Sequence, residues 1–326
     1  PVISKTISER YQELDGLTPI QFAASAGFDQ WILALTPNST DVNAPNQYLM
    51  TPLHMAATDG YYHTVKTLCD LGANPKAENK NKQLPIFSAL MLPIDGDEDL
   101  KERKLRIFKY LKTKASETLK HQDNSGNTVL HLIATYGYSS LIEDVLYSVP
   151  ELFAIQNNHN RYPIHTAILD SQIECVRQFI SMPNIEQLTD AEGETALHYA
   201  AKYGSKEMIA LCSTAFKTID IPDDTGKTPL MAAAESGNIA ALEALIAEGA
   251  DVTLTDPSGH SLLHYAVYYH LTDSTDWILN NISAIDVNAR NHSGQTALNI
   301  CEERKDEDKI NLLKKHGATD GIAFSG

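Results

Sequence analysis

The chain has 326 residues, of which 43% are hydrophobic, and it carries a formal net charge of −16 at pH 7. The charge is uneven, since residues 1–163 hold 15 Lys and Arg against 18 Asp and Glu, whereas residues 164–326 hold 11 against 24. This acidity argues against nucleic acid or an anionic membrane as the main partner and favours a partner with basic features.

The apolar pattern and the cysteines point to a protein of a reducing compartment. No apolar run approaches the ~20 residues that a membrane-spanning helix needs, so we predict no membrane span. The four cysteines are far apart in the sequence: Cys69, Cys175, Cys212 and Cys301. This spacing predicts buried, reduced thiols rather than a disulfide framework or a zinc site, and we therefore expect a cytoplasmic protein.

A short motif recurs along the chain at a nearly constant period. The fullest copy reads Thr-Pro-Leu-His-Met-Ala-Ala at residues 51–57, and residues 195–201 repeat it as Thr-Ala-Leu-His-Tyr-Ala-Ala. We call the Thr position of each copy the mark. The marks fall at positions 18, 51, 84, 128, 162, 195, 228, 261 and 296. The gaps between them are 33 to 35 residues, except for one of 44 residues after position 84.

Each copy predicts a pair of helices. A Thr at the mark accepts a backbone N–H bond at the start of the first helix, and a following Pro loses no hydrogen bond there. Glycines are then predicted to end the first helix in the left-handed conformation, which needs no β-carbon. These are Gly27, Gly60, Gly137, Gly204 and Gly237. A second helix with apolar spacing follows, as in residues 239–246, and a turn-rich loop such as residues 223–226 leads to the next copy.

This pattern resembles the ankyrin-repeat family over almost the whole chain. The resemblance implies an all-α fold, a solenoid of about nine helix-turn-helix repeats joined by β-hairpin-like fingers. We predict an N-terminal capping segment at 1–13, a repeat domain at 14–319 and a tail at 320–326. The repeats are expected at about 14–46, 47–79, 80–123 with an insertion, 124–157, 158–190, 191–223, 224–256, 257–291 and 292–319.

The third repeat departs most from the pattern, because it carries the 11-residue excess and a basic stretch. Residues 101–120 hold eight Lys and Arg against two Glu, with Leu105, Phe108 and Leu111 as the expected buried stripe. One interpretation is a second docking surface formed by Lys101, Arg103, Lys104 and Lys112. The alternative, which we favour, is a lengthened second helix with a solvated basic face.

The recurring histidines suggest a metal site only at first sight. They occupy the same place in five repeats: His54, His131, His165, His198 and His264. In ankyrin proteins this His is structural, and a ladder does not bring three or four ligands together on one ion. Residues 226–228 resemble the end of a phosphate-binding loop, but Ile221 stands where that loop needs Gly. We predict no catalytic residue, no metal and no cofactor, and hence no enzymatic activity.

Two asparagines lie in a loop motif that resembles the one modified by asparaginyl hydroxylases in ankyrin proteins. They are Asn43, in Asp-Val-Asn-Ala at 41–44, and Asn288, in Asp-Val-Asn-Ala at 286–289. Hydroxylation is one interpretation. The other, which we favour, is that each Asn supports the loop.

The resemblance places partner binding on the concave side, formed by finger tips and the ends of the first helices. Eight residues after the mark this rim carries Tyr136, Asp170, Tyr203 and Tyr269. Further candidates nearby are Tyr48, Glu192, Glu194 and Tyr268. Tyrosine is common in binding hot spots, and carboxylates would orient a basic peptide and speed its approach. The alternative is that each Tyr packs across the neighbouring helix end.

We therefore predict a monomeric protein-interaction scaffold or adaptor that binds a protein or peptide, with no catalysis of its own. One alternative is a regulatory or substrate-recruiting arm of a larger enzyme or channel. The irregular repeats also resemble ankyrin effectors that bacteria deliver into a host cytosol. The fold alone names no partner.

Overall fold

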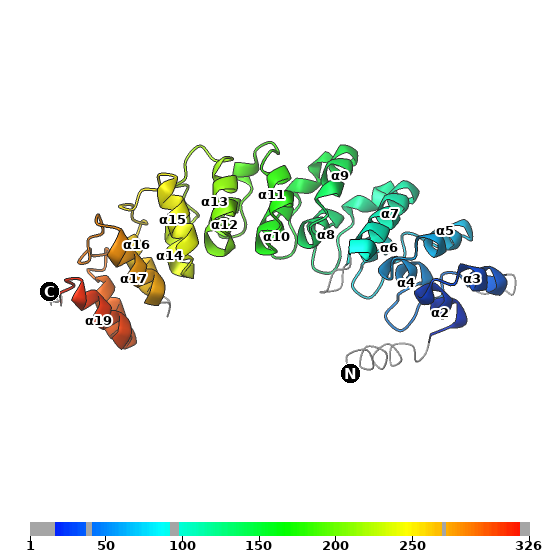
Figure 1. Ribbon diagram of the computed structural model, residues 1–326, viewed down its shortest axis with the longest axis horizontal. Coiled ribbons are helices and arrows are strands. Elements are labelled where there is room, and N and C mark those ends of the chain that lie inside the picture. Colours follow the sequence, from blue (N-terminus) through cyan, green and yellow to red (C-terminus); the bar gives the residue numbers. More distant parts are fainter. Residues whose placement is uncertain (1–16, 37–40, 92–97, 269–271, 320–326) are drawn as a thin grey trace. The chain divides into compact units, whose positions relative to one another are not determined.

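The computed structural model describes residues 17–36, 41–91, 98–268 and 272–319, and the chain divides into two units, Pro1–His159 and Asn160–Gly326. Helices joined by turns and loops make up the described residues, which contain no strand (Figure 1). The α-helices of the first unit are α2 (Pro19–Ala26), α3 (Asp29–Leu35), α4 (Pro52–Thr58), α5 (Tyr62–Asp70), α6 (Pro85–Ser88), α7 (Glu98–Lys114), α8 (Val129–Tyr136) and α9 (Ile142–Ser148). Those of the second unit are α10 (Pro163–Leu169), α11 (Ile173–Phe179), α12 (Ala196–Tyr203), α13 (Lys206–Ser213), α14 (Pro229–Ser236), α15 (Ile239–Ala247), α16 (Leu262–Tyr268), α17 (Thr272–Asn281), α18 (Ala297–Arg304) and α19 (Glu307–Lys315).

Within each unit the helices form two layers. First helices pack on first helices of the next pair, as in α2 on α4 and α12 on α14, and second helices pack on second helices, as in α3 on α5 and α13 on α15. Every copy of the motif thus contributes one helix pair that is completed by its neighbours. This arrangement confirms the predicted all-α solenoid fold. No helix within the described ranges combines the length and apolarity needed to cross a membrane.

The starts of the first helices follow the predicted chemistry. Thr51 has extended backbone angles (φ −84°, ψ 165°), Pro52 follows it, and a capping box joins Thr51 to His54. In this box the Thr hydroxyl faces the backbone N–H three residues on, while the side chain at that place faces the N–H of the Thr. Thr128 and Thr195 are capped by His in the same way.

The ends of the first helices confirm most of the glycine predictions. Gly27, Gly137 and Gly237 are left-handed caps with φ between 69° and 75°. Gly204 contradicts its prediction, because its backbone is extended (φ −88°, ψ 170°). The chain there runs straight into Ser205, whose hydroxyl accepts a hydrogen bond from the N–H of Met208 and so caps α13 at once.

The loop before each first helix, which we call the finger, is held by an Asn or Asp five residues before the mark. Asp190 shows the arrangement, since its Oδ1 accepts hydrogen bonds from the backbone N–H of Glu192 (3.0 Å) and of Glu194 (2.9 Å). Successive fingers are joined by backbone bonds, such as that from the N–H of Asp224 to the carbonyl of Glu192 (3.1 Å). Residues of this kind stand in eight fingers: Asn46, Asn79, Asp123, Asn157, Asp190, Asp223, Asp256 and Asn291.

Helix α7 buries a different stripe from the predicted one. Phe108 and Leu111 are buried as expected, but Leu105 is only half-buried, and Lys104 lies in the core with an exposed fraction of 0%. The ammonium group of Lys104 donates to the carbonyl of Ser88 (3.1 Å) and to that of Met91, at the end of the short α6. Burial lowers the pKa of Lys104 to about 8, partly opposed by the charge of Asp59.

Candidate functional site

Three of the five recurring histidines, His54, His198 and His264, connect a first helix to the next finger. In the ring of His54, Nδ1 lies 3.2 Å from the backbone nitrogen of Thr51, and Nε2 lies 3.0 Å from the carbonyl oxygen of Gln83. A ring that donates from Nε2 and accepts at Nδ1 satisfies both bonds. His198 makes the equivalent contact with the carbonyl of Lys227 (2.9 Å), and His264 with that of Gln295 (3.0 Å).

His54, His198 and His264 are therefore bridges between repeats. Burial lowers the pKa of His54 to about 4, and it also lowers the pKa of His198 and of His264, although the carbonyl that each ring meets opposes the shift. Gln21 takes the same place in the first repeat. Its Oε1 accepts from the N–H of Thr18 (3.0 Å), and its Nε2 donates to the carbonyl of Ala44 (2.8 Å). Among the described residues no cluster of His, Cys, Asp and Glu is arranged to hold a metal ion.

The second unit has a groove along α12, α14 and the fingers that precede them, with a volume of about 750 Å³. Five carboxylates and three cationic side chains line it, together with two tyrosines. The lining residues are Arg161, Asp190, Glu192, Glu194, Tyr199, Lys202, Tyr203, Asp223, Thr225, Lys227, Glu235 and Ser236. The groove thus has an acidic excess, as predicted for this half of the chain.

Many of these charged side chains form ion pairs with one another. The ammonium group of Lys227 lies 3.2 Å from Glu194, 3.0 Å from Glu235 and 3.7 Å from Asp223, and Lys202 pairs with Glu194 as well. Burial by itself would lower the pKa of Lys227, but the hydrogen bond and charge of Glu235, with the charge of Glu194, raise it overall. This network fastens the finger to the first helix on either side.

A buried tyrosine fixes the floor of the groove. The hydroxyl of Tyr199 donates to Oδ2 of Asp190 (2.8 Å), the residue whose other oxygen holds the finger backbone. The ring of Tyr199 stacks on the ring of His165 with centroids 4.5 Å apart. Burial and the hydrogen bond to Asp190 both raise the pKa of Tyr199, so its hydroxyl remains a donor.

The groups that remain available to a partner are fewer than the lining suggests. Tyr203 has an exposed fraction of 53%, and it lies beside Tyr199 with ring centroids 6.0 Å apart. Glu192 and Asp224 are exposed on neighbouring finger tips that the backbone bond of 3.1 Å holds together. No cation in the described part of the chain lies within ion-pair distance of either carboxylate. An exposed ring at the end of α12 and two adjacent carboxylates on the finger tips together suit a cationic side chain with an apolar stem.

The structure brings together only some of the predicted binding residues. Glu192, Glu194 and Tyr203 meet at the groove. Glu194 needs correction, because it is buried at 5% exposure and paired with Lys202 and Lys227, so it has no free carboxylate to offer. The other predicted binding residues that the structure describes do not line this groove.

Tyr268 is 49% exposed, but the guanidinium of Arg304 covers its ring at 4.0 Å from the centroid. Asp170 is exposed at the end of α10. Tyr136 is half-buried at the end of α8, in the first unit. Tyr269 lies outside the described residues.

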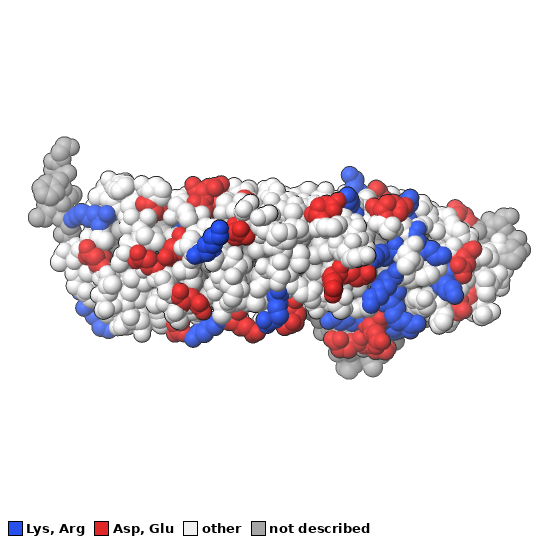
Figure 2. Space-filling view, turned by 90° about the horizontal axis from the view of Figure 1, so that it is seen from above, with Lys and Arg blue, Asp and Glu red and all other residues white. Residues whose placement is uncertain are grey.

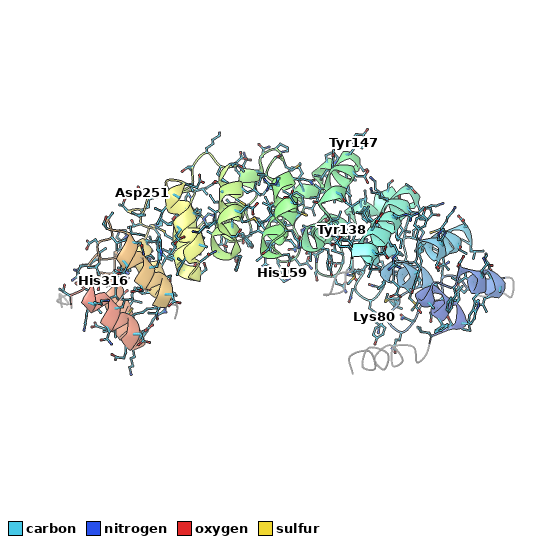
Figure 3. All side chains as sticks on the ribbon, in the orientation of Figure 1. Lys80, Tyr138, Tyr147, His159, Asp251 and His316 are labelled. Carbon is cyan, nitrogen blue, oxygen red and sulfur yellow. The ribbon has the colours of Figure 1, made fainter. Side chains whose placement is uncertain are left out.

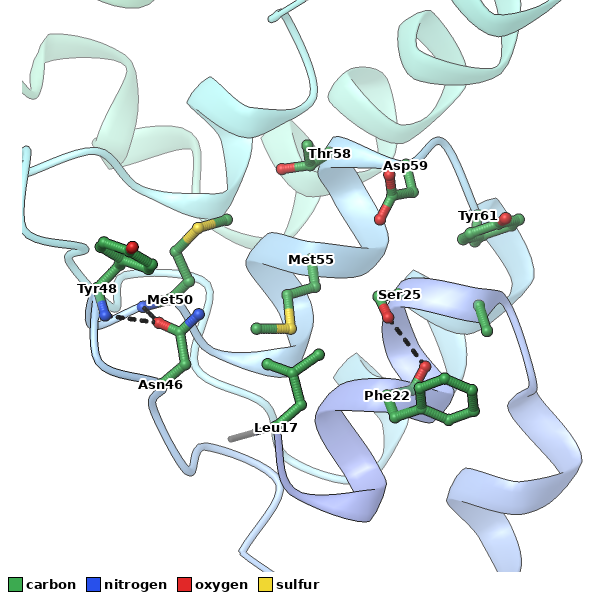
Figure 4. Close-up of a pocket in the computed structure, with 11 residues that line it drawn as sticks. Leu17, Phe22, Ser25, Asn46, Tyr48, Met50, Met55, Thr58, Asp59 and Tyr61 are labelled. Atoms are coloured by element: carbon green, nitrogen blue, oxygen red, sulfur yellow. Dashed lines mark hydrogen bonds between the residues drawn. The ribbon is translucent and has the colours of Figure 1, made fainter. Parts of the chain in front are cut away.

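Tyr48 belongs to a separate, largely apolar hollow in the first unit (Figure 4). This hollow has a volume of about 600 Å³. The ring of Tyr48 is 55% exposed, and Met50 and Met55 lie nearby in the lining with Leu17 and Phe22. Lys80, from the next finger, lies 5.8 Å from the centroid of Tyr48.

The four residues predicted as a second docking surface all have internal partners. Lys104 is buried, which contradicts its assignment to a docking surface. Lys101 and Arg103 lie 3.9 Å and 3.5 Å from the carboxylates of Glu98 and Asp99, and Lys112 lies 2.6 Å from that of Asp144. The basic face of α7 is therefore made by other side chains.

Asn43 and Asn288 tie consecutive loops of the second-helix layer together. Oδ1 of Asn43 accepts from the N–H of Asn74 (2.7 Å), and Oδ1 of Asn288 accepts from the N–H of Thr319 (2.9 Å). Nδ2 of Asn288 also donates to the carbonyl of Gly317 (3.2 Å). These bonds fit the supporting role that the sequence favoured, while hydroxylation stays a prediction.

Sequence reasoning missed the Asn and Asp of the fingers and the tyrosine that braces them. A signal existed, because an Asn or Asp stands five residues before eight of the marks. Tyr265 also follows Asp256 by nine residues, as Tyr199 follows Asp190, and its hydroxyl donates to that carboxylate (3.0 Å). A search for the spacing of nine between acid and tyrosine would have found both pairs.

Comparison with known proteins gives one family. The family model described as "Ankyrin repeats (3 copies)" matches residues 3–79 and 164–256, just over half of the chain. The nuclear factor NF-kappa-B p105 subunit of Gallus gallus is 27% identical over 206 residues, which cover 60% of this chain and 21% of that protein. A transient receptor potential cation channel subfamily A member 1 homolog of Caenorhabditis elegans is 27% identical over 199 residues, covering 60% of this chain and 15% of that protein.

A third relative, the ANK repeat-containing protein nipk-1 of Caenorhabditis elegans, is 26% identical over 235 residues, covering 63% of this chain and 38% of that protein. This chain thus spans less than half of the length of these relatives. The crystal structure of the human ASB11 ankyrin repeat domain superposes with a TM-score of 0.59 at 18% identity, covering 72% of this chain and 99% of that one. This likeness supports the fold.

Proposed function

Since the chain belongs to the ankyrin-repeat family, we propose that it binds a basic segment of a partner protein in the groove of its second unit. Ankyrin repeats indicate a protein–protein interaction module. The basic character of the partner and the groove as its site are the proposal. It is carried by one observation: exposed Tyr203 lies at a groove whose finger tips carry the adjacent carboxylates of Glu192 and Asp224.

The internal ion pairs support this assignment of roles. Lys202 and Lys227 neutralise the buried carboxylates, so they fix the walls and leave the finger-tip carboxylates to act outward. Tyr203 would supply buried apolar area at a low cost in side-chain entropy. Glu192 and Asp224 would orient a Lys or Arg of the partner and increase the rate of association.

A selection from a random peptide library, with the purified chain as bait, tests the proposal. The selected peptides should be enriched in Lys and Arg, and their affinity should fall at least several-fold in a Tyr203→Ala variant and in a Glu192→Gln/Asp224→Asn variant. Tyr147→Ala is the matched control, since Tyr147 is 89% exposed and projects from α9 in the first unit (Figure 3). The association rate should also fall when salt rises from about 50 mM to about 300 mM.

Peptides without basic enrichment, or equal losses in Tyr147→Ala and Tyr203→Ala, would contradict the proposal. A second candidate is that the module is an arm of a larger protein. Its support is that this chain covers only 15% of the channel homolog and 21% of the p105 subunit. The length of the transcript tests this candidate, because a long additional reading frame favours it and a frame of about this length does not.

A further inference from the structure

We propose that α5 and α7 carry a second docking surface, which takes an acidic segment of a partner protein. It lies in the first unit and has the opposite charge to the groove of the second unit, so it goes beyond the function proposed above. We call this surface the basic ridge. It consists of Lys66, Arg106, Lys109 and Lys114 with Tyr62 and Tyr110.

The cations of the ridge differ from the other cations of α7. Lys104 donates its hydrogen bonds to backbone carbonyls. Lys101, Arg103 and Lys112 lie within 4 Å of carboxylates, as described above. By contrast, the four cations of the ridge are exposed, and no carboxylate of the described residues lies within ion-pair distance of them. In the space-filling view of Figure 2, Lys and Arg (blue) gather on the surface of the first unit.

Two aromatic rings support the ridge. The guanidinium carbon of Arg106 lies 4.7 Å from the ring centroid of Tyr62, and the ammonium of Lys114 lies 5.2 Å from that of Tyr110. The two rings meet edge to face at 5.8 Å, which joins α5 to α7. A guanidinium held over a ring keeps its N–H edge free for a carboxylate. Because the rings restrain these side chains beforehand, less entropy is lost when a ligand binds.

The spacing of the cations favours a run of carboxylates. Arg106, Tyr110 and Lys114 follow one another at four-residue intervals on α7, as Tyr62 and Lys66 do on α5, so each set shares a helix face. Eight residues of helix span roughly 12 Å, which is about the length of four residues of extended peptide. A single phosphate would need its cations to converge on one point, whereas these stand in a row.

The charge of the rest of the chain limits where an acidic segment can bind. Glu102 and Asp70 are exposed on the same two helices, four residues before Arg106 and four residues after Lys66, so each continues a row of the ridge. The charge of Asp70 also acts on Lys114. The chain as a whole carries −16, so most of its surface repels an acidic segment. With a Debye length of about 10 Å at 0.1 M salt, the ridge still acts on groups that touch it.

Binding of a fluorescein-labelled peptide of alternating Glu and Asp, measured by anisotropy with the full chain, tests the proposal. The same peptide built from Gln and Asn is the ligand control. In the Arg106→Gln/Lys109→Gln variant the affinity should fall about fivefold to tenfold, since each exposed charge pair contributes up to about a factor of five. Tyr62→Leu, which keeps all charges, should weaken binding about twofold to threefold.

The matched control variant is Lys76→Gln/Lys120→Gln, which removes the same charge from exposed lysines elsewhere in the first unit. It should bind the acidic peptide within twofold of the wild type. Equal weakening in both double variants, equal binding of the Gln and Asn peptide, or displacement of the peptide by inorganic phosphate at low concentration would overturn the proposal. So would a concentration-dependent doubling of mass that Arg106→Gln/Lys109→Gln abolishes, because the ridge would then bind a second copy of the chain.

Discussion

Lowering the pH is expected to destabilise the first unit, because unfolding frees His54 to take up a proton that its folded site disfavours. The His54 side chain is fully buried, and its pKa is lowered from 6.5 to about 4. Its Nδ1 also faces the backbone N–H of Thr51 (3.2 Å), so a proton at that nitrogen would oppose a donor. Between pH 6.5 and about 4 the unfolded chain therefore binds more protons than the folded one.

The sign and size of the effect follow from this difference. The free energy of unfolding contributed by His54 is fully present above pH 6.5 and is lost as the pH falls toward about 4. A shift of about 2.5 units corresponds to about 3 kcal/mol, of which about 1.4 kcal/mol is lost by pH 5.5. His198 and His264, whose pKa values are also lowered, act in the same direction in the second unit.

The first repeat supplies the variant that isolates this effect. Gln21 already makes both bonds of the histidine without titrating, so His54→Gln should keep the contacts to Thr51 and Gln83. We expect this variant to retain most of its stability at neutral pH and to lose about 1.4 kcal/mol less than the wild type on going to pH 5.5. His54→Leu, which leaves an N–H and a carbonyl unpaired, should be about 2–4 kcal/mol less stable than the wild type at neutral pH. Because Leu does not titrate, this difference from the wild type should shrink by about 1.4 kcal/mol at pH 5.5.

Urea unfolding followed by circular dichroism measures these differences, and amide exchange of residues 51–57 reports whether the change is local. The free energy of unfolding must depend on urea concentration with the same slope in the wild type and the variants. This condition matters because repeat arrays do not always unfold in one step. The common acid sensitivity of the carboxylates cancels when wild type and His54→Gln are compared. If both proteins lost the same free energy between neutral pH and pH 5.5, the ring of His54 would not be the titrating group.

Three further substitutions test the contacts within the second unit. Tyr199→Phe removes the hydrogen bond to Asp190 and should cost about 1 kcal/mol in urea unfolding, with little change in helix content. Lys227→Met removes the cation shared by buried Glu194 and two other carboxylates. The free energy of unfolding should fall by about 2–3 kcal/mol at neutral pH. The decrease should be smaller at acidic pH, because the carboxylates are then protonated. Ser171→Gly should raise the melting temperature, because Ser171 has φ 55° where other repeats place glycine; a lower value would contradict this.

The helix pairs could be predicted from the sequence because their causes are local. The Thr at the mark, the following Pro and the apolar spacing act within a few residues. The start of each first helix can therefore be predicted from the residues around it. Gly204 shows the limit of this reasoning. Its conformation depends on whether the next residue can begin a helix, and Ser205 does so through its hydroxyl. The glycine alone carries no information on that choice.

The candidate site was less predictable, since it depends on contacts between repeats. Glu194 and Lys202 are eight residues apart and meet only because the finger folds back on the first helix. Lys104 is buried where α6, only four residues long, ends, and its ammonium donates to the carbonyls of Ser88 and Met91. Charge counts along the sequence could not separate these internal cations from the exposed ones of the ridge.

Position within the repeat offers a better separation of structural from recognition residues. Some residues recur from repeat to repeat, such as the Thr at the mark and the His or Gln three residues on. Their side chains form hydrogen bonds within the repeat array, as those of His54 and Gln21 do. A recurring residue therefore cannot distinguish one ankyrin protein from another. Recognition must come from exposed positions where the repeats differ, and Tyr203 and Arg106 are of this kind. Substitutions there should change binding at nearly constant stability, whereas substitutions at the mark should change stability first.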